Sequence, residues 1–137
     1  NPAFSEVVKE KTNGNGVDLI LDCVGASYFA ENMASIKIEG TWIVYGLMGG
    51  FSVENFDMRG ILGKRITLTG TTLRTRSVDY KIGLINSFKE FGALERFDDQ
   101  TFRPIIDRMF SIEEIAEANR YMESNANIGK IVLQVKH

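Results

Sequence analysis

Apolar positions along the chain follow two spacings, one typical of buried strands and one typical of helices. Residues 17–25 (VDLILDCVG) are almost continuously apolar, which predicts a strand buried on both faces of a sheet. Residues 41–46 (TWIVYG) and the β-branched run at 65–74 (RITLTGTTLR) predict two more strands. Because helical segments separate the three strands, their order predicts a parallel α/β sheet.

Two segments with helical features lie on either side of the first predicted strand. In residues 1–16, Asn1-Pro2 or Ser5 is expected to cap a helix that ends in an Asn-Gly-Asn-Gly turn. In residues 26–40, apolar positions recur at helical spacing, and Gly40 is expected to end the helix. Both segments fit the helices that cover a parallel sheet.

The second half of the chain continues with helices and two further strands. Residues 55–64 predict a short helix or turn, and residues 77–92 predict an amphipathic helix. The C-terminal part then predicts a strand, a helix and a closing strand at 129–135 (GKIVLQV). Ser111 and Glu114 have the spacing of a capping box at the start of that helix.

Composition indicates an ordinary globular chain and narrows its partners. Of the 137 residues, 44% are hydrophobic and 25% are charged, with a formal net charge of -2. No cluster of basic residues is long enough to bind a polyanion, so nucleic acid is not an expected partner. No apolar run approaches the roughly 20 residues of a membrane span. The sequence therefore predicts no membrane partner and a cytoplasmic location.

The chain has one cysteine, Cys23, and one histidine, His137. A single cysteine excludes an internal disulfide and a cysteine-rich zinc site. His137 is the last residue, where it is also compatible with the stub of an expression tag. Histidine-based triads and zinc sites therefore have no candidates within this sequence.

The glycine-rich turn Gly46-Leu47-Met48-Gly49-Gly50 fits neither the dinucleotide-binding G-x-G-x-x-G pattern nor a phosphate-binding P-loop. In an open α/β sheet, ligands nevertheless lie at the carboxyl ends of the strands. Small residues at those ends allow the backbone to approach a cofactor closely. The alternative is that these glycines only permit tight exits from the strands.

Three stretches, VDLILDCVG, WIVYGLMGG and ESNANIGKIVL, resemble the quinone oxidoreductase branch of the medium-chain dehydrogenase/reductase family. The resemblance covers almost the whole chain and implies the second half of a doubly wound Rossmann sheet, followed by a strand-helix-strand that returns to the catalytic domain. It assigns residues 1–97 to the NADP-binding domain and 98–137 to the GroES-like catalytic domain. It also implies that the chain is the C-terminal part of a longer enzyme whose phosphate-binding glycines lie upstream.

The resemblance further implies a cofactor-binding wall for NADPH. One strand end matches the wall of the adenosine half, a second matches the turn beside the nicotinamide, and a third lies near the nicotinamide carboxamide. A late segment matches the part that returns to the cleft. In that order the positions are Cys23, Val24 and Gly25; Gly46, Leu47 and Met48; Thr71, Thr72 and Leu73; and Asn127 and Lys130.

Each candidate has a structural alternative. Cys23 is also a typical small buried hydrophobe, and Lys130 is also a typical solvated charge at the start of a strand. Arg74 and Arg76 are candidates for steering phosphates or a quinone oxygen, although exposed loop arginines are common. Three aromatic residues are candidates for a substrate pocket, with core packing as the alternative for the first: Trp42, Tyr45 and Phe51.

The functional expectation is a zinc-independent, NADPH-dependent enzyme that reduces a quinone or an enone by hydride transfer. Its catalytic residues are expected outside this sequence, so the isolated chain is expected to be inactive. A segment of a zinc-dependent alcohol dehydrogenase and a non-catalytic structural or dimerisation module remain the alternatives. The resemblance also implies a homodimer that pairs through the edge strand at residues 66–73.

Overall fold

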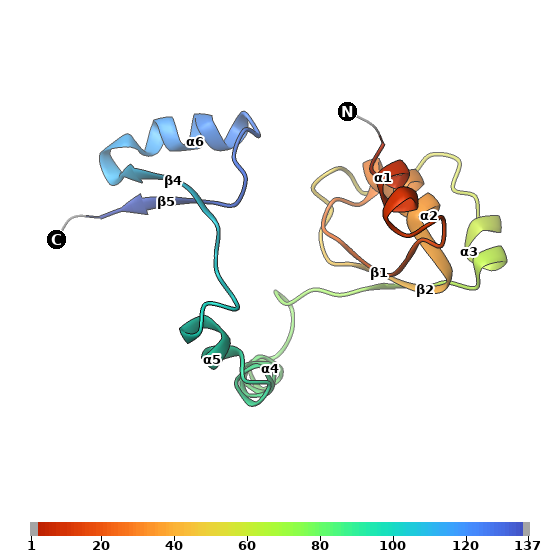
Figure 1. Ribbon diagram of the computed structural model, residues 1–137, viewed down its shortest axis with the longest axis horizontal. Coiled ribbons are helices and arrows are strands. Elements are labelled where there is room, and N and C mark those ends of the chain that lie inside the picture. The colour runs from red at the N-terminus through yellow and green to blue at the C-terminus, as the bar shows by residue number, and fades with distance from the viewer. Residues whose placement is uncertain (1–2, 136–137) are drawn as a thin grey trace. The chain divides into compact units, whose positions relative to one another are not determined.

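The computed structural model describes residues 3–135 (Figure 1). It divides into two compact units, Asn1–Ser77 and Val78–His137, and each is described by itself. The predicted division at residue 97 concerns the two domains of a whole enzyme and stays a prediction. The suggested Asn1-Pro2 cap and His137 lie outside the described residues.

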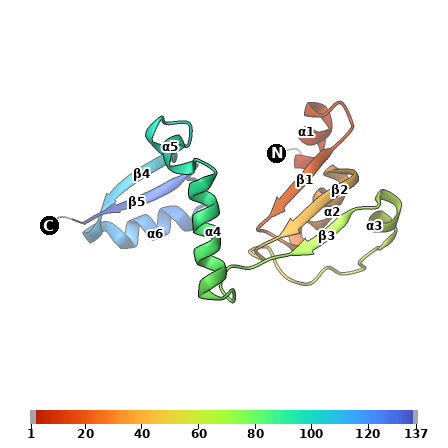
Figure 2. The ribbon, with the colours of Figure 1, turned by 90° about the horizontal axis from the view of Figure 1, so that it is seen from below.

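The first unit is a parallel three-stranded sheet with helices, as the sequence predicts. Figure 2 shows its strands side by side in the order β1-β2-β3. The elements in chain order are α1 (Phe4–Lys11), β1 (Val17–Asp22), η1 (Ala26–Tyr28), α2 (Phe29–Ser35), β2 (Ile36–Val44), α3 (Arg59–Lys64) and β3 (Thr67–Gly70). The parallel α/β class is therefore confirmed, whereas β3 is shorter than the predicted strand at 65–74.

The junction between α2 and β2 differs from the prediction, which extended the helix to Gly40. The helix ends at Ser35, and Ile36 already has extended backbone angles of φ -72° and ψ 135°. Ile36 is β-branched and only 1% exposed, so it packs better in the sheet than in a helix. Gly40 then passes close over it, because an added Cβ would lie 2.6 Å from the Ile36 Cγ1.

The start of α1 also differs from one of the predicted caps. Ser5 lies inside the helix and is buried, and its backbone N–H donates a 2.9 Å hydrogen bond to Glu31 Oε2 of α2. The bond ties the two helices together. The predicted turn after α1 is confirmed, and the Thr12 hydroxyl holds it by donating to the Val8 carbonyl at 2.7 Å and accepting from the Gly16 N–H at 2.9 Å.

The core of the first unit lies on one face of the sheet. Ile36, Trp42 and Ile66 are buried there, and side chains of α2 and α3 pack against them. Burying a side chain such as Ile36 stabilises the fold by roughly 1.5–3 kcal/mol. On the opposite face, Leu19 is 50% exposed and Leu21 is 61% exposed. The prediction that this strand is buried on both faces is therefore wrong within this unit, because its helices cover only one face.

The second unit contains α4 (Val78–Glu90), α5 (Ala93–Asp98), β4 (Ile106–Ser111), η2 (Ile112–Glu114), α6 (Ile115–Glu123) and β5 (Lys130–Gln134). β4 and β5 pair in parallel, with α6 as the crossover between them (Figure 1). The capping box is confirmed, since both of its reciprocal hydrogen bonds are formed. The short helix α5 was not predicted. Gly92, with a φ of 75°, ends α4 and lets α5 begin directly after it.

None of the helices that the model describes has both the length and the apolar character needed to span a membrane.

Candidate functional site

The carboxyl ends of β2 and β3 border an open cavity of about 780 Å³ in the first unit. Four of the predicted cofactor-binding residues line it: Gly46, Leu47, Thr71 and Thr72. Arg74 and Arg76, the two candidate steering residues, lie in the same lining. The structure thus brings together the turns after two neighbouring strands, which is where an open α/β sheet binds its ligands.

Backbone hydrogen bonds fix both strand exits at this cavity. The Tyr45 N–H donates to the Asp22 carbonyl at 2.8 Å, and the Thr71 N–H donates to the Val44 carbonyl at 2.9 Å. The next N–H groups along the chain, those of Gly46, Leu47 and Thr72, make no hydrogen bond within residues 3–135. These donors are therefore available to a bound polar group or to water.

Cys23, Val24 and Gly25 do not line the cavity; they form a second turn that supports the first. The Cys23 carbonyl accepts a 3.2 Å hydrogen bond from the Met48 N–H, and the Val24 carbonyl accepts a 2.7 Å bond from the Gly49 N–H. Two bonds in the other direction reach the Gly49 and Gly50 carbonyls from η1. The two predicted segments are thus brought together as one hydrogen-bonded pair of turns.

The glycines of these turns approach protein backbone. A Cβ added at Gly46 would lie 2.7 Å from the Cys23 carbonyl oxygen, and one added at Gly25 would lie 2.7 Å from the Gly50 carbonyl oxygen. Gly25 also has a φ of 83°, which side chains disfavour. At both positions the geometry agrees with the alternative interpretation, in which glycine permits a tight strand exit. For Gly46 the two interpretations coexist, because its backbone also faces the cavity.

Asp22 is the residue that sequence reasoning missed. The residue is 4% exposed, and its carboxylate accepts four hydrogen bonds. Oδ1 accepts from the Val24 and Gly25 N–H groups at 2.8 and 2.9 Å. Oδ2 accepts from Asn32 Nδ2 at 3.0 Å and from Trp42 Nε1 at 3.1 Å. The available signal was a lone carboxylate at the end of an apolar strand, which a buried position tolerates only when it is fully hydrogen-bonded.

Tyr45 lines the cavity, and its side chain lies beside that of Cys23. Hydrogen bonding with Cys23 is the largest cause that raises the pKa of Tyr45, and electrostatic interaction with Cys23, burial and Asp22 add to the shift. Tyr45 remains 52% exposed, and Cys23 is half-buried. A partly accessible phenol hydroxyl therefore stays protonated at neutral pH next to the proposed ligand position.

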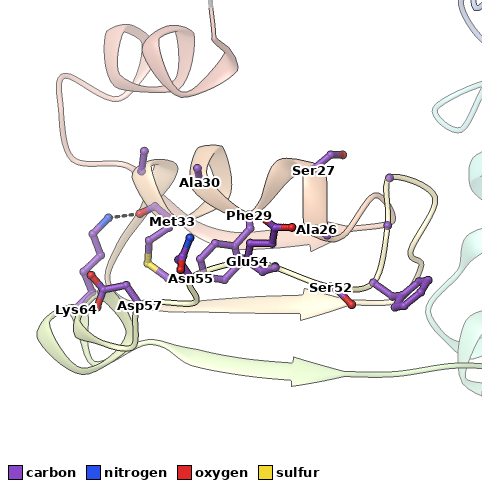
Figure 3. A pocket seen from close by; sticks show the side chains of 16 residues that line it. Ala26, Ser27, Phe29, Ala30, Met33, Ser52, Glu54, Asn55, Asp57 and Lys64 are labelled. Atoms are coloured by element: carbon purple, nitrogen blue, oxygen red, sulfur yellow. Dashed lines mark hydrogen bonds between the residues drawn. The ribbon is translucent and has the colours of Figure 1, made fainter.

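The three aromatic candidates for a substrate pocket are not brought together. Trp42 is 2% exposed and belongs to the core, as its alternative predicted, whereas Tyr45 lines the cavity at the strand ends. Phe51 lines a different and larger cavity of about 1050 Å³ between α2, the segment that follows β2, and α3 (Figure 3).

Lys64 lies at one end of this larger cavity, near Asp57 (Figure 3). Its Nζ donates to the Met33 and Ile36 carbonyls, both at 2.6 Å. Burial, with a smaller effect of Lys9, lowers the pKa of Lys64. Because these carbonyls belong to the end of α2, the ammonium group serves to cap that helix.

The remaining predicted residues lie outside the lining of either cavity. Met48 is 85% exposed and Leu73 is 53% exposed. Asn127 and Lys130 belong to the second unit, where Asn127 Nδ2 donates to the Gly129 carbonyl at 3.1 Å and the Lys130 N–H donates to the Ile105 carbonyl at 2.8 Å. Their return to the cofactor cleft stays a prediction. Within the described residues, no group of three or more histidine, cysteine or acidic side chains is arranged to hold a metal ion.

Comparison with known proteins shows that this chain is similar to dehydrogenases. A family model described as zinc-binding dehydrogenase matches residues 2–133. The chain is 25% identical to quinone oxidoreductase-like protein 2 of Bos taurus over 135 residues, covering 98% of this chain and 38% of that protein.

Two solved structures share the fold. An NAD-dependent alcohol dehydrogenase superposes with a TM-score of 0.73 at 21% identity, over 99% of this chain and 36% of its own. A mycobacterial protein solved in complex with NADPH superposes with a TM-score of 0.66 at 22% identity, over 95% of this chain and 39% of its own. This chain therefore spans less than two fifths of the length of each of these proteins.

Proposed function

Because the chain belongs to the zinc-binding dehydrogenase family, within the medium-chain dehydrogenases and reductases, we propose that it forms the nicotinamide-facing wall of an NADPH-dependent quinone or enone reductase. The observation that carries this proposal is the cavity at the ends of β2 and β3, with its unpaired backbone donors. An oxidoreductase role follows from the family; the cofactor, the substrate and zinc independence are proposed.

The residues at the cavity fit a nicotinamide carboxamide. The carboxamide needs one hydrogen-bond donor and one acceptor partner, and the backbone N–H and C=O groups of the two turns supply both kinds. The N–H groups of Gly46, Leu47 and Thr72 are the donors. Because backbone groups on fixed turns cannot rotate as side chains do, they would hold one face of the ring toward the substrate.

The nicotinamide, when bound, supplies the hydride, so the chain needs no nucleophile of its own. Gly46 and Leu47 would orient the ring, and Thr71 and Thr72 would border its carboxamide. Arg74 and Arg76 place positive charge in the same lining, which favours an anionic phosphate or the oxygen of a reduced quinone. Tyr45 lines the same cavity, and its hydroxyl, which is hydrogen-bonded with Cys23, would border the bound group.

Two observations bear on the substrate and cofactor. The bovine relative is described as quinone oxidoreductase-like, and the mycobacterial neighbour was solved with NADPH. The main rival is a zinc-dependent alcohol dehydrogenase, which the family description and the NAD-dependent neighbour favour. Among residues 3–135 no group of three or more histidine, cysteine or acidic side chains is arranged to hold a metal ion.

The test is steady-state kinetics with the protein at its native length. We expect oxidation of NADPH with a quinone or an enone, slower oxidation of NADH, and no stoichiometric zinc in metal analysis. Stoichiometric zinc together with alcohol-dependent reduction of NAD would establish the rival. The 137-residue chain alone is expected to be inactive, and measurable NADPH oxidation by it would contradict that expectation.

We also propose a homodimer that pairs through β3. The strand is exposed along its length and hydrogen-bonds only to β2 within the described residues. An unpaired edge strand readily pairs with a second copy. The double substitution Thr67→Lys and Thr69→Lys is expected to convert the dimer to a monomer in analytical ultracentrifugation. Ser87→Lys on α4 is expected to leave the dimer unchanged. A wild-type monomer at micromolar concentration would contradict the proposal.

A further inference from the structure

Asp22 carries the only charge among the buried side chains that the structure describes. It lies outside the lining of both cavities, so it is not placed to touch a ligand. Burial of a carboxylate is costly unless hydrogen bonds compensate for the lost water. The four bonds that it accepts supply this compensation, and they also fix the carboxylate in place.

A continuous series of hydrogen bonds leads from this carboxylate to the cavity. In the first step, Oδ1 holds the Val24 and Gly25 N–H groups. In the second step, the carbonyls of that same turn hold the N–H groups of Met48 and Gly49, at 3.2 and 2.7 Å. Gly46 and Leu47, which line the cavity, immediately precede these two residues.

The other carboxylate oxygen connects the series to the rigid part of the unit. Oδ2 accepts from Asn32 on α2 and from Trp42 on β2. Trp42 is buried in the core and its ring lies 5.4 Å from that of Phe29. The carboxylate is therefore anchored to a helix and a central strand on one side and to a loop on the other.

We propose that Asp22 is a positioning residue, which sets the backbone of Gly46 and Leu47 and thereby the face that the nicotinamide presents to the substrate. The identity of the bound group rests on the proposed function. The mechanical link from Asp22 to the turn at residues 46–49 does not, so the two are tested separately.

The link is tested by amide hydrogen exchange on the chain without cofactor. Asp22→Asn keeps the shape of the side chain but leaves one acceptor oxygen for two pairs of donors. We expect the Met48 and Gly49 amides to exchange at least about tenfold faster than in the wild type, measured against the slowest amides of β2 in the same variant. The control is Ile66→Val, which removes one methyl group from the core and touches none of these hydrogen bonds; these amides are expected to change by less than about threefold relative to the slowest amides of β2.

The functional consequence is tested with NADPH that carries deuterium on one or the other face of C4. At its native length, the wild-type protein is expected to transfer from a single face. Asp22→Asn is expected to transfer measurably from both faces with a kcat lower by roughly 10- to 100-fold, since a small misplacement of a reacting group has effects of this size. Loss of stability alone lowers the amount of active protein and leaves the face selectivity intact, as we expect for Ile66→Val, a core substitution outside the hydrogen-bond series.

Each outcome decides between the two proposals. Equal protection of Met48 and Gly49 in Asp22→Asn and the wild type would overturn the link. Faster exchange in the variant, together with no NADPH-dependent turnover by the wild-type protein at its native length, would leave the link standing and refute the proposed function. If Asp22→Asn does not fold, the wild type still tests the link: unprotected exchange at Met48 and Gly49 overturns it, and protection equal to that of β2 supports it.

Discussion

The two units each contain an aspartate that clamps a loop against a parallel strand pair, but the two clamps differ in burial. Asp22 of the first unit is buried and accepts bonds from two loop N–H groups and two side chains. Asp107 of the second unit is exposed, and accepts from the Ile128 N–H at 3.1 Å and the Tyr121 hydroxyl at 2.8 Å. Water can replace the bonds of Asp107 and cannot replace those of Asp22. Similar geometry therefore predicts very different consequences of substitution.

The largest effect is expected for Asp22→Ala. The donors of Asn32 and Trp42 would be left unpaired in a buried position, at a cost of about 1–3 kcal/mol each. We expect the free energy of unfolding of the first unit to fall by roughly 2–6 kcal/mol in urea titrations followed by circular dichroism. Asp18→Ala, on the same strand but exposed, serves as the control; it loses only an exposed ion pair with Lys37, so a much smaller loss is expected. Equal losses in the two variants would show that burial of the Asp22 carboxylate does not determine the cost of removing it.

The next effect concerns the turn that Asp22 supports. Gly46→Ala would place a Cβ 2.7 Å from the Cys23 carbonyl oxygen, so we expect a loss of about 1–3 kcal/mol in the same titration. The matched control is Gly63→Ala in α3, where an added Cβ meets nothing within 4 Å. That variant is expected to gain about 0.5–1 kcal/mol, because alanine favours the helix. If Gly46→Ala left the free energy of unfolding unchanged, the turn would be able to shift and accommodate the added Cβ.

A smaller effect is expected at the capping box of the second unit. Ser111→Ala removes the side chain that accepts from the first turn of the following helix, at a cost of about 1 kcal/mol. This loss of stability is measured as a decrease in the thermal unfolding midpoint of the chain. Ser87→Ala, at an exposed position inside α4, is the control and is expected to leave the midpoint unchanged or slightly higher. A midpoint for Ser111→Ala equal to that of Ser87→Ala would argue against the cap.

The smallest effect is expected for the exposed clamp. The Ile128 N–H and then the Tyr121 hydroxyl hold the pKa of Asp107 below its ordinary value of 3.8. A lowered pKa means that the bonded carboxylate stabilises the fold above the ordinary pKa, and that this contribution is lost as pH falls through the folded-state pKa. As the pH falls below the ordinary carboxylate pKa of 3.8, the unfolding midpoint should fall slightly less steeply in Asp107→Asn than in the wild type. Identical pH profiles would show that water holds this loop equally well.

The elements that the sequence predicted well are those whose signal is local. Apolar spacing located α4 and β5, and the four-residue pattern at Ser111 located a cap that the structure contains. The junction at Ile36 was wrong because the same apolar spacing continued from helix into strand. The choice between helix and strand at Ile36 depends on its tertiary environment, because Ile36 is buried beside β1.

The candidate site was predictable to a similar degree. The rule that ligands lie at strand ends, together with the family resemblance, located Gly46, Leu47, Thr71 and Thr72 in one lining. Asp22 was missed because its partners lie as far as 20 positions away in sequence, at Trp42. Such a hydrogen-bond network has no periodicity in the sequence, so no local sequence pattern predicts it.

Trp42 makes the two units distinguishable by spectroscopy. It is the only tryptophan in the sequence, it is 2% exposed, and its indole N–H is bonded to the carboxylate of Asp22. Its fluorescence emission should therefore be shifted to short wavelength in the folded chain and should move to longer wavelength when the first unit alone unfolds. The second unit contributes no tryptophan emission. A fluorescence transition that precedes or follows the change in helical circular dichroism would show that the two units melt as separate cooperative bodies.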